Sequence, residues 1–273
     1  MRADLHVHTT ASDGTLSPAA IVARAVEHGV ELLSITDHDT LAAYDALQVP
    51  SGLTMITGVE LSARWDRMTV HIVGLGVDRA SPAMVQAQKT LLAARAERAA
   101  RIAEKLAPLG LDDPLAAAQR HACGAAVGRP HFASALVEAG IVTDAGEAFR
   151  RYLGAGKRGD VGHFWPEQAT VIEWILAAGG VAVLAHPLHY RMTMSRLKRL
   201  LRDFVAQGGS AIEVLSGRQN ADEIRRTTLL ARQFGLAASC GSDFHRPHRY
   251  GPELGCTGPL PAGLIPVWER ITP

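Results

Sequence analysis

The chain has 273 residues, 47% of them hydrophobic, which is enough to bury a sizeable core in one large α/β domain. A formal net charge of +1 argues against a protein that coats nucleic acid, and 5% aromatic residues argue against an extended base-stacking surface. Neither value excludes a short anionic substrate held in one pocket.

Three cysteines without a CxxC spacing suit a reducing compartment better than a disulfide scaffold. The chain reaches Asp4 and His6 before any apolar stretch, which is not the pattern of a signal peptide. The longest nearly apolar run, residues 175–185, is too short to span a bilayer. We therefore expect a cytoplasmic protein with no membrane partner and no obligate protein partner.

Short apolar runs alternate with helix-like runs, which is the pattern of parallel β-α units. We predict seven strands, at residues 3–7, 31–36, 53–57, 69–74, 181–185, 211–215 and 237–240. We predict helices at residues 18–28, 41–47, 83–106, 167–178, 195–207 and 221–234. The first helix has the clearest boundaries, with Ser17 as N-cap, Pro18 in the first turn and Gly29 as the stop.

The alternation is interrupted once. The stretch from Pro108 to about Trp165 has helix signals and glycine-rich turns but no clear strand. We therefore predict a (β/α) region made of residues 1–95 and 167–273, and a mostly helical insertion, residues 96–166, that covers the active site.

Two fragments carry alternating metal-type ligands directly after an apolar run: Asp4-Leu5-His6-Val7-His8 and Gly241-Ser242-Asp243-Phe244-His245. Residues two apart in a strand share a face, so His6 should project with His8 and Asp243 with His245. Further histidines and carboxylates lie at or near other predicted strand ends. Nine residues are candidate ligands: His6, His8, Asp13, His38, Glu60, His71, His186, Asp243 and His245.

Imidazole and carboxylate together suit Zn, Mn or Fe, and nine groups can hold two or three divalent ions if a carboxylate bridges. The candidates follow several different strands. In a closed barrel every strand ends at one mouth, whereas an open sheet gathers its site mainly at the switch point. The pattern therefore favours a barrel.

Seven motifs together resemble the set that marks the polymerase-and-histidinol-phosphatase (PHP) family. They are His6-Val7-His8, Asp13, Thr36-Asp37-His38, Gly58-Val59-Glu60, His71, Ala185-His186-Pro187 and Gly241-Ser242-Asp243-Phe244-His245. The resemblance covers residues 1 to about 80 and about 167 to 250. It implies a distorted seven-stranded (β/α) barrel with a trinuclear metal centre at the carboxyl ends of the strands.

The resemblance also implies a division of the ligands among the ions. His6, His8, Glu60 and Asp243 resemble the ligands of a first ion. Glu60 would bridge to a second ion that His71 and His186 complete. Asp13, His38 and His245 resemble the ligands of a third.

The insertion carries a shorter resemblance. Gly128-Arg129-Pro130-His131 and Gly154-Ala155-Gly156-Lys157 are similar to the subfamily that includes the 3′,5′-nucleoside bisphosphate phosphatases, which also degrade short RNAs from the 5′ end. This implies a phosphoesterase that converts pAp to AMP and acts on 5′-phosphorylated short RNA. Arg129, whose planar fork matches phosphate oxygens, is the main candidate for binding substrate, with His131 and Lys157 beside it. A solvated arginine or lysine is the alternative for Arg129 and Lys157.

Three ions beside three carboxylates would form a net positive cavity that attracts phosphate. Two bridged ions can share a hydroxide as the nucleophile, because metal binding lowers the pKa of water. Three candidates for the general acid remain open: His131, His189 and a metal-bound water.

Three other functions remain open. The first is a PHP phosphomonoesterase acting on another small metabolite such as histidinol phosphate. The second is amidohydrolysis on a similar barrel, which generally uses a lysine near a strand end; none is seen here. The third is a non-catalytic metal-binding or polymerase-accessory module, although a structural metal would not need open coordination positions.

Overall fold

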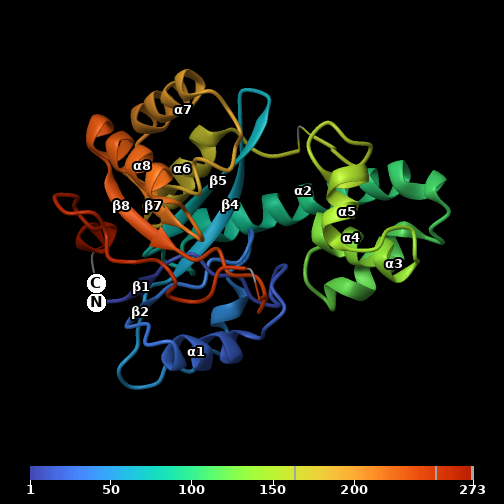
Figure 1. The fold of residues 1–273 in the computed structure, drawn as a ribbon, viewed down its shortest axis with the longest axis horizontal. Helices are drawn as coiled ribbons and strands as arrows, with labels where there is room; N and C mark the ends of the chain where they lie inside the picture. Colours follow the sequence, from blue (N-terminus) through green and yellow to red (C-terminus); the bar gives the residue numbers. More distant parts are fainter. Residues whose placement is uncertain (163, 250, 272–273) are drawn as a thin grey trace.

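The computed structural model describes residues 1–162, 164–249 and 251–271, and within these ranges eight strands form two sheets (Figure 1). The smaller sheet is parallel and has the order β1 (Ala3–Asp4), β2 (Leu32–Leu33) and β3 (Thr54–Met55). The larger sheet has the order β4 (Gly58–Trp65), β5 (Met68–Leu75), β6 (Val181–Leu184), β7 (Ala211–Ser216) and β8 (Ala237–Gly241).

The α-helices of the described chain are α1 (Pro18–Glu27), α2 (Pro82–Leu106), α3 (Pro114–Ala122), α4 (Arg129–Glu138), α5 (Ala145–Ala148), α6 (Gln168–Ala177), α7 (Met194–Ala206) and α8 (Ala221–Phe234). Short 3₁₀ segments lie at Ala42–Tyr44, Ala107–Leu109 and Val267–Arg270, and a π-helical turn, Phe149–Leu153, follows α5. No described helix is long and apolar enough to cross a bilayer.

Helix α1 begins and ends where its local sequence predicts. The Ser17 hydroxyl accepts the Ala20 N–H at 3.2 Å, and Pro18 occupies the first turn. Gly29 follows the helix with φ of 69°, a conformation that costs glycine little. The helix buries Ile21, which belongs to the core around the smaller sheet.

The predicted all-parallel arrangement is wrong at β5, which runs antiparallel to both β4 and β6. The cause is a two-residue turn: Asp66 adopts φ of 56°, and Trp65 pairs with Met68 across it. The chain therefore reverses immediately, without a helical crossover. The described strands form two sheets, and no closed seven-stranded barrel is found among them. His71 lies inside β5 and not at a strand end.

The helix predicted at residues 41–47 is only the 3₁₀ turn Ala42–Tyr44. The Tyr44 hydroxyl donates to the Ile35 carbonyl at 2.7 Å and accepts the Gly58 N–H at 2.9 Å. These tertiary bonds hold the segment against the smaller sheet, and the sequence pattern does not show them.

The predicted helical stretch extends from the sheets as a separate lobe (Figure 1). Helix α2 runs from the larger sheet into this lobe, where α3 packs against α2, α4 against α3, and α5 against α4. Buried residues of the lobe, among them Ile102, Phe132 and Leu136, form their own hydrophobic cluster.

Backbone hydrogen bonds join the first and last strands near their carboxyl ends. The Leu5 N–H donates to the Cys240 carbonyl at 2.9 Å, and the Asp243 N–H donates to the His6 carbonyl at 2.8 Å. A Cβ at Gly241 would lie 2.3 Å from His6 Cβ, so only glycine permits this approach. The two fragments with alternating ligands therefore lie side by side.

Candidate metal centre

The structure brings all nine predicted ligands into one cluster. The amino-terminal pair meets the carboxyl-terminal aspartate directly: His8 Nε2 lies 3.3 Å and His6 Nε2 lies 3.7 Å from Asp243 Oδ1. His6 Nε2 and His8 Nε2 are 3.1 Å apart.

Glu60 lies at the middle of the cluster and is fully buried in β4. Five imidazoles place a ring nitrogen 2.9–3.3 Å from its carboxylate: His6, His8, His38, His71 and His186. Asp13 forms the outer edge, with Oδ1 3.3 Å from His245 Nε2 and Oδ2 3.7 Å from His38 Nε2.

Four overlapping groups have ligand atoms within 4.8 Å of one another. They are His8, Asp13, His38 and His245; His6, Glu60 and His186; His6, His8 and Asp243; and His38, Glu60 and His71. Two buried ligand atoms in the cluster, His8 Nδ1 and His186 Nδ1, lack a hydrogen bond to any described residue. His38 Nδ1 and Glu60 Oε2 lie 2.9 Å apart but are not aligned for a hydrogen bond. Buried polar atoms are normally satisfied, so the donor set and its unsatisfied atoms fit divalent cations.

The carboxylates are held in the charged form that binds cations. Burial raises the pKa of Glu60, but nearby imidazoles, led by that of His6, outweigh burial and bring it well below its ordinary value. The same balance lowers the pKa of Asp13 and of Asp243. Burial dominates for His71 and lowers its pKa to about 4, which keeps this imidazole neutral.

Glu213 is a buried carboxylate that sequence reasoning missed. It accepts a hydrogen bond from His6 Nδ1, and its Oε2 accepts the His186 N–H at 2.6 Å. This arrangement leaves His6 Nε2 facing the cluster. A glutamate inside the apolar run of β7 is the signal that could have revealed it.

Two ligands lie on strained backbone. His186 has φ of 28° and Asp243 has φ of 54°, both in the left-handed region that non-glycine residues rarely adopt. Such conformations concentrate at functional sites, where the surrounding structure holds them.

A cavity of about 110 Å³ adjoins the cluster, with Asp13, His38 and His71 among its lining residues. Arg95 and Arg98 from α2 and Arg129 from α4 also line it, and we call it the arginine cavity. Arg95 pairs with Asp39, whereas Arg98 and Arg129 donate to backbone carbonyls, those of Val161 and Leu153. Burial, together with Arg129 and Arg95, lowers the pKa of Arg98 to about 9. The cavity is therefore rich in positive charge and suited to an anion.

Arg95 and Arg98 were not predicted from the sequence. Their i,i+3 spacing puts both on one face of α2, but solvated helix faces show the same pattern. The ring of Trp165 lies under both guanidinium groups, at 5.3 and 5.4 Å.

Three further residues were predicted to bind substrate or donate a proton: His131, His189 and Lys157. His131 is buried at the start of α4, where its Nδ1 accepts the Gly128 N–H at 2.9 Å, and burial lowers its pKa. The exposed His189 stacks on His186 with ring centroids 5.3 Å apart. Lys157 is exposed on a turn and is not among the described residues that line the arginine cavity.

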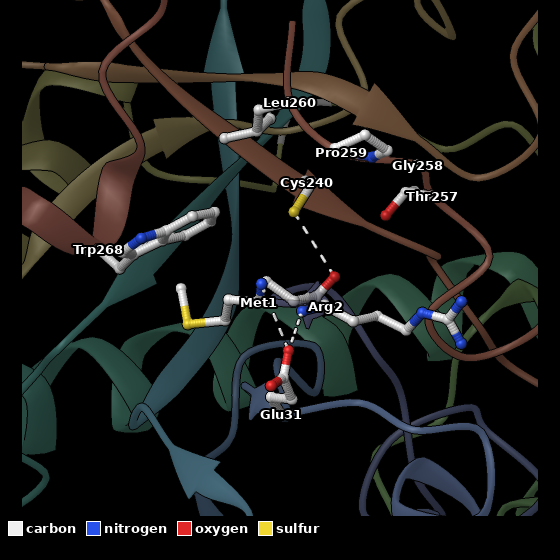
Figure 2. Close-up of a pocket in the computed structure, with 10 residues that line it drawn as sticks. Met1, Arg2, Glu31, Cys240, Thr257, Gly258, Pro259, Leu260 and Trp268 are labelled. Carbon is white, nitrogen blue, oxygen red and sulfur yellow. Dashed lines mark hydrogen bonds and ion pairs between the residues drawn. The ribbon is translucent and has the colours of Figure 1, made fainter. Parts of the chain in front are cut away.

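A separate hollow of about 320 Å³ lies beside the first residues of the chain (Figure 2). Its polar groups already have partners: the Met1 amino group lies 3.4 Å from the Glu31 carboxylate, the Arg2 backbone N–H donates to Glu31, and the Arg2 guanidinium donates to the His28 carbonyl. None of the four potential metal-binding groups includes a residue that lines this hollow. The residues that line this hollow therefore do not indicate a catalytic site.

Comparison of the sequence with known proteins identifies the family of the chain. The PHP domain family matches residues 4–110. The 3′,5′-nucleoside bisphosphate phosphatase of Chromobacterium violaceum is 41% identical, over 98% of this chain and 95% of its own length. The 5′-3′ exoribonuclease Rnm of Escherichia coli is 44% identical, over 97% of this chain and 92% of its own. The chain belongs to the PHP family.

A solved structure has a fold similar to that of this PHP protein. It is described as an amidohydrolase from C. violaceum with bound sulfate and no metal. Its TM-score is 0.89 at 39% identity, and the match covers 99% of this chain and 96% of that chain. The PHP resemblance inferred from the motifs is confirmed.

Proposed function

We propose that this protein is a metal-dependent phosphoric ester hydrolase. It removes the 3′-phosphate of nucleoside 3′,5′-bisphosphates, converting pAp to AMP, and shortens 5′-phosphorylated RNA from its 5′ end. One observation carries this proposal: the ligand cluster adjoins the arginine cavity directly, so a substrate with two phosphates can place one at each. The names of the C. violaceum and E. coli relatives support it.

The nine clustered residues would hold two or three divalent ions, with Mn, Zn and Fe as the candidates. Such ions, when bound, supply positive charge to a phosphate and lower the pKa of water. Around them, Glu213 orients His6, and the charged carboxylates of Asp13, Glu60 and Asp243 would offset part of the cationic charge.

The arginine cavity would bind the 5′-phosphate. Arg98 and Arg129 can each present N–H groups to phosphate oxygens, and a partly buried site strengthens such charge-assisted bonds. Lys157 would add only outer, long-range attraction from its exposed turn.

Both proposed activities break the same bond. In each, the oxygen of water joins phosphorus, the bond from phosphorus to O3′ breaks, and a proton goes to O3′. With pAp the products are inorganic phosphate and AMP. With RNA they are a 5′-mononucleotide and a shorter RNA whose new 5′-phosphate makes it a substrate again.

His131 and His189 are the candidates for donating the proton to O3′. Because His131 Nδ1 accepts the Gly128 N–H, the neutral ring carries its proton on Nε2 and can present it to an oxygen. His189 instead stacks on His186 at the exposed side of the cluster.

We also propose that residues 96–166 act as a lobe covering the site of the surrounding region, residues 1–95 and 167–273. Arg98, Arg129 and Trp165 support this role, because they line the arginine cavity together with Asp13 and His38.

The test is a substrate profile of the metal-loaded protein with pAp, a 5′-phosphorylated RNA trimer, histidinol phosphate and an N-acyl amino acid amide. We expect phosphate release from pAp and mononucleotide release from RNA. Good turnover of histidinol phosphate without turnover of pAp would overturn the substrate choice. Amide hydrolysis alone would favour the activity named for the C. violaceum structure.

A second test concerns the arginine cavity. Arg129→Ala should raise KM for pAp by roughly 10- to 100-fold, the range given by losing one charge-assisted hydrogen bond of about 1.5–3 kcal/mol. The matched control is Arg120→Ala, at an exposed position on α3, which should leave KM unchanged. An unaltered KM in Arg129→Ala would return this residue to a solvated or structural role.

A further inference from the structure

A second hollow adjoins the ligand cluster on the side of the last strand. It measures about 250 Å³ and is lined by Asp243, His245, Arg246, His248, Gly251 and Pro252. We call it the β8 hollow. Arg246 and His248 are exposed, whereas Asp243 and His245 belong to the cluster itself.

The β8 hollow and the arginine cavity meet at the cluster. Asp13 lines the arginine cavity and His245 lines the β8 hollow, and these two side chains lie 3.3 Å apart. A phosphodiester at the cluster therefore has two hollows within reach, one enclosed by arginines and one at the surface.

The two proposed substrates differ in how many hollows they need. The 3′-phosphate of pAp ends at the cluster, so pAp needs only the arginine cavity for its 5′-phosphate. In RNA the same phosphorus carries a further nucleoside through its O5′. That part of the chain has to leave the cluster by another path.

We propose that the β8 hollow is the path of the downstream RNA chain, with Arg246 as a contact for the next phosphate and His248 as a surface for a base. This inference rests on the proposed function and concerns how the same site accepts RNA. The chemistry of the hollow agrees with such an occupant. An exposed guanidinium pairs with phosphate, and an imidazole plane stacks on a base without regard to its sequence.

The inference makes Arg246 a specificity residue. It should matter for RNA and not for pAp, and its effect should grow once a second downstream phosphate is present. The dinucleotide pApA has only the phosphate that is cleaved between its nucleosides, whereas pApApA has one more for Arg246 to contact.

The experiment measures kcat/KM of the metal-loaded full chain for pAp, pApA and pApApA at several salt concentrations. Arg246→Gln should reduce kcat/KM for pApApA by roughly threefold to tenfold, and Arg246→Glu by more. Loss of one phosphate contact should also make the slope of log kcat/KM against log salt shallower by about 0.7. Values for pAp should stay within about twofold of wild type in the same salts.

Arg225→Gln is the matched control. It removes one exposed arginine charge from α8, where Arg225 pairs with Asp222, away from the lining of either hollow. It should leave all three substrates unchanged.

Two outcomes overturn the inference: an equal effect of Arg246→Gln on pAp and pApApA, or no effect on pApApA. Failure of the proposed function looks different, because wild type would then cleave neither pAp nor RNA. Cleavage of pAp with no cleavage of pApApA by wild type would overturn the RNA path and leave the bisphosphatase standing.

Discussion

At the scale of single residues, Glu60 organises the centre. One carboxylate lies within 3.3 Å of nitrogens from five histidines that come from widely separated parts of the chain. Four of the nine clustered residues, His6, His8, Asp243 and His245, could be predicted because they alternate after an apolar run. The other five could be predicted because they lie at or near predicted strand ends in motifs that resemble those of the PHP family. Glu213, Arg95 and Arg98 could not, because their role depends on neighbours that only the folded chain supplies.

Glu213→Gln should weaken metal binding by about 10- to 100-fold, the usual cost of removing a partner that orients a ligand. The amide keeps the shape of the side chain but removes the charge that favours the Nδ1–H form of His6. Metal content after dialysis against a series of buffered metal concentrations measures the effect. Arg129→Ala, which leaves the cluster intact, serves as the control and should bind metal normally. Wild-type metal affinity in Glu213→Gln would contradict the orienting role.

Cys240 should be inert to thiol reagents in the folded protein. Burial raises its pKa to about 12, so at pH 8 it remains a thiol, whereas the thiolate is the reactive form. With 5,5′-dithiobis(2-nitrobenzoic acid) we expect only the exposed Cys123 and Cys256 to react before unfolding. A rapid third equivalent from the folded chain would contradict this.

The raised pKa of Cys240 also determines how its contribution to the free energy of unfolding changes with pH. Above the ordinary thiol pKa of 9.0 the unfolded chain loses the Cys240 proton, while the folded chain keeps it until about pH 12. The contribution of Cys240 to the free energy of unfolding is therefore complete below pH 9.0 and declines through this window.

At the scale of elements, helices α1 and α2 and strands β5 to β8 lie within one residue of their predicted bounds, whereas the helix predicted at residues 41–47 is a 3₁₀ turn and β4 was not predicted. Ser17 and Ser81 cap α1 and α2 as hydroxyl N-caps with proline in the first turn, and both helices begin where the sequence predicts, within one residue. Strand β4 was missed because the sequence indicates Gly58-Val59-Glu60 as the end of the strand predicted at residues 53–57, whereas the structure begins a new strand at Gly58. The sharp turn at Asp66 then sets the pairing of β4 with β5. Strand lengths and directions depend on partners far along the chain, which periodicity does not reveal.

Removing a buried side chain from the hydrophobic cluster of the lobe should destabilise the whole lobe. Phe132→Ala removes a fully buried ring from the lobe cluster, at a cost of about 3–5 kcal/mol. Amide hydrogen exchange should accelerate in α3 and α4 and stay slow in α8, because the main core is a separate cluster. KM for pAp should rise as Arg129 loses its position.

Phe204→Ala is the matched control, because Phe204 is equally buried but belongs to the main core through α7. It should accelerate exchange around the larger sheet first. Uniform acceleration of exchange across both regions in Phe132→Ala would show that the lobe and the sheets unfold together.

At the scale of the whole molecule, three hydrophobic clusters and one cluster of candidate metal ligands share the described chain. The hydrophobic clusters stabilise the fold, whereas the nine ligands bring several imidazoles and three carboxylates into a small volume. A bound cation would offset the negative charge of the three carboxylates, but it is not needed to form the hydrophobic clusters. The family and the general α/β class could be predicted from motifs spread along the chain, but the division into two sheets could not.

Metal removal should therefore abolish activity while leaving the chain folded. After chelation we expect loss of pAp hydrolysis, an unchanged far-ultraviolet circular dichroism spectrum and a lower Tm. Restoring Mn at about 100 times its Kd should add about 2.7 kcal/mol to the free energy of unfolding and recover activity. Complete unfolding on chelation would indicate a structural metal, and full activity without metal would contradict a metal-dependent reaction.

The pairing of Leu5 with Cys240 and of His6 with Asp243 also has a consequence for biosynthesis. His6 is translated more than two hundred codons before Asp243, with which it pairs. A nascent chain thus cannot assemble the centre until residues 243–245 have left the ribosome. Until then, an enzyme able to degrade RNA would lack its complete ligand cluster.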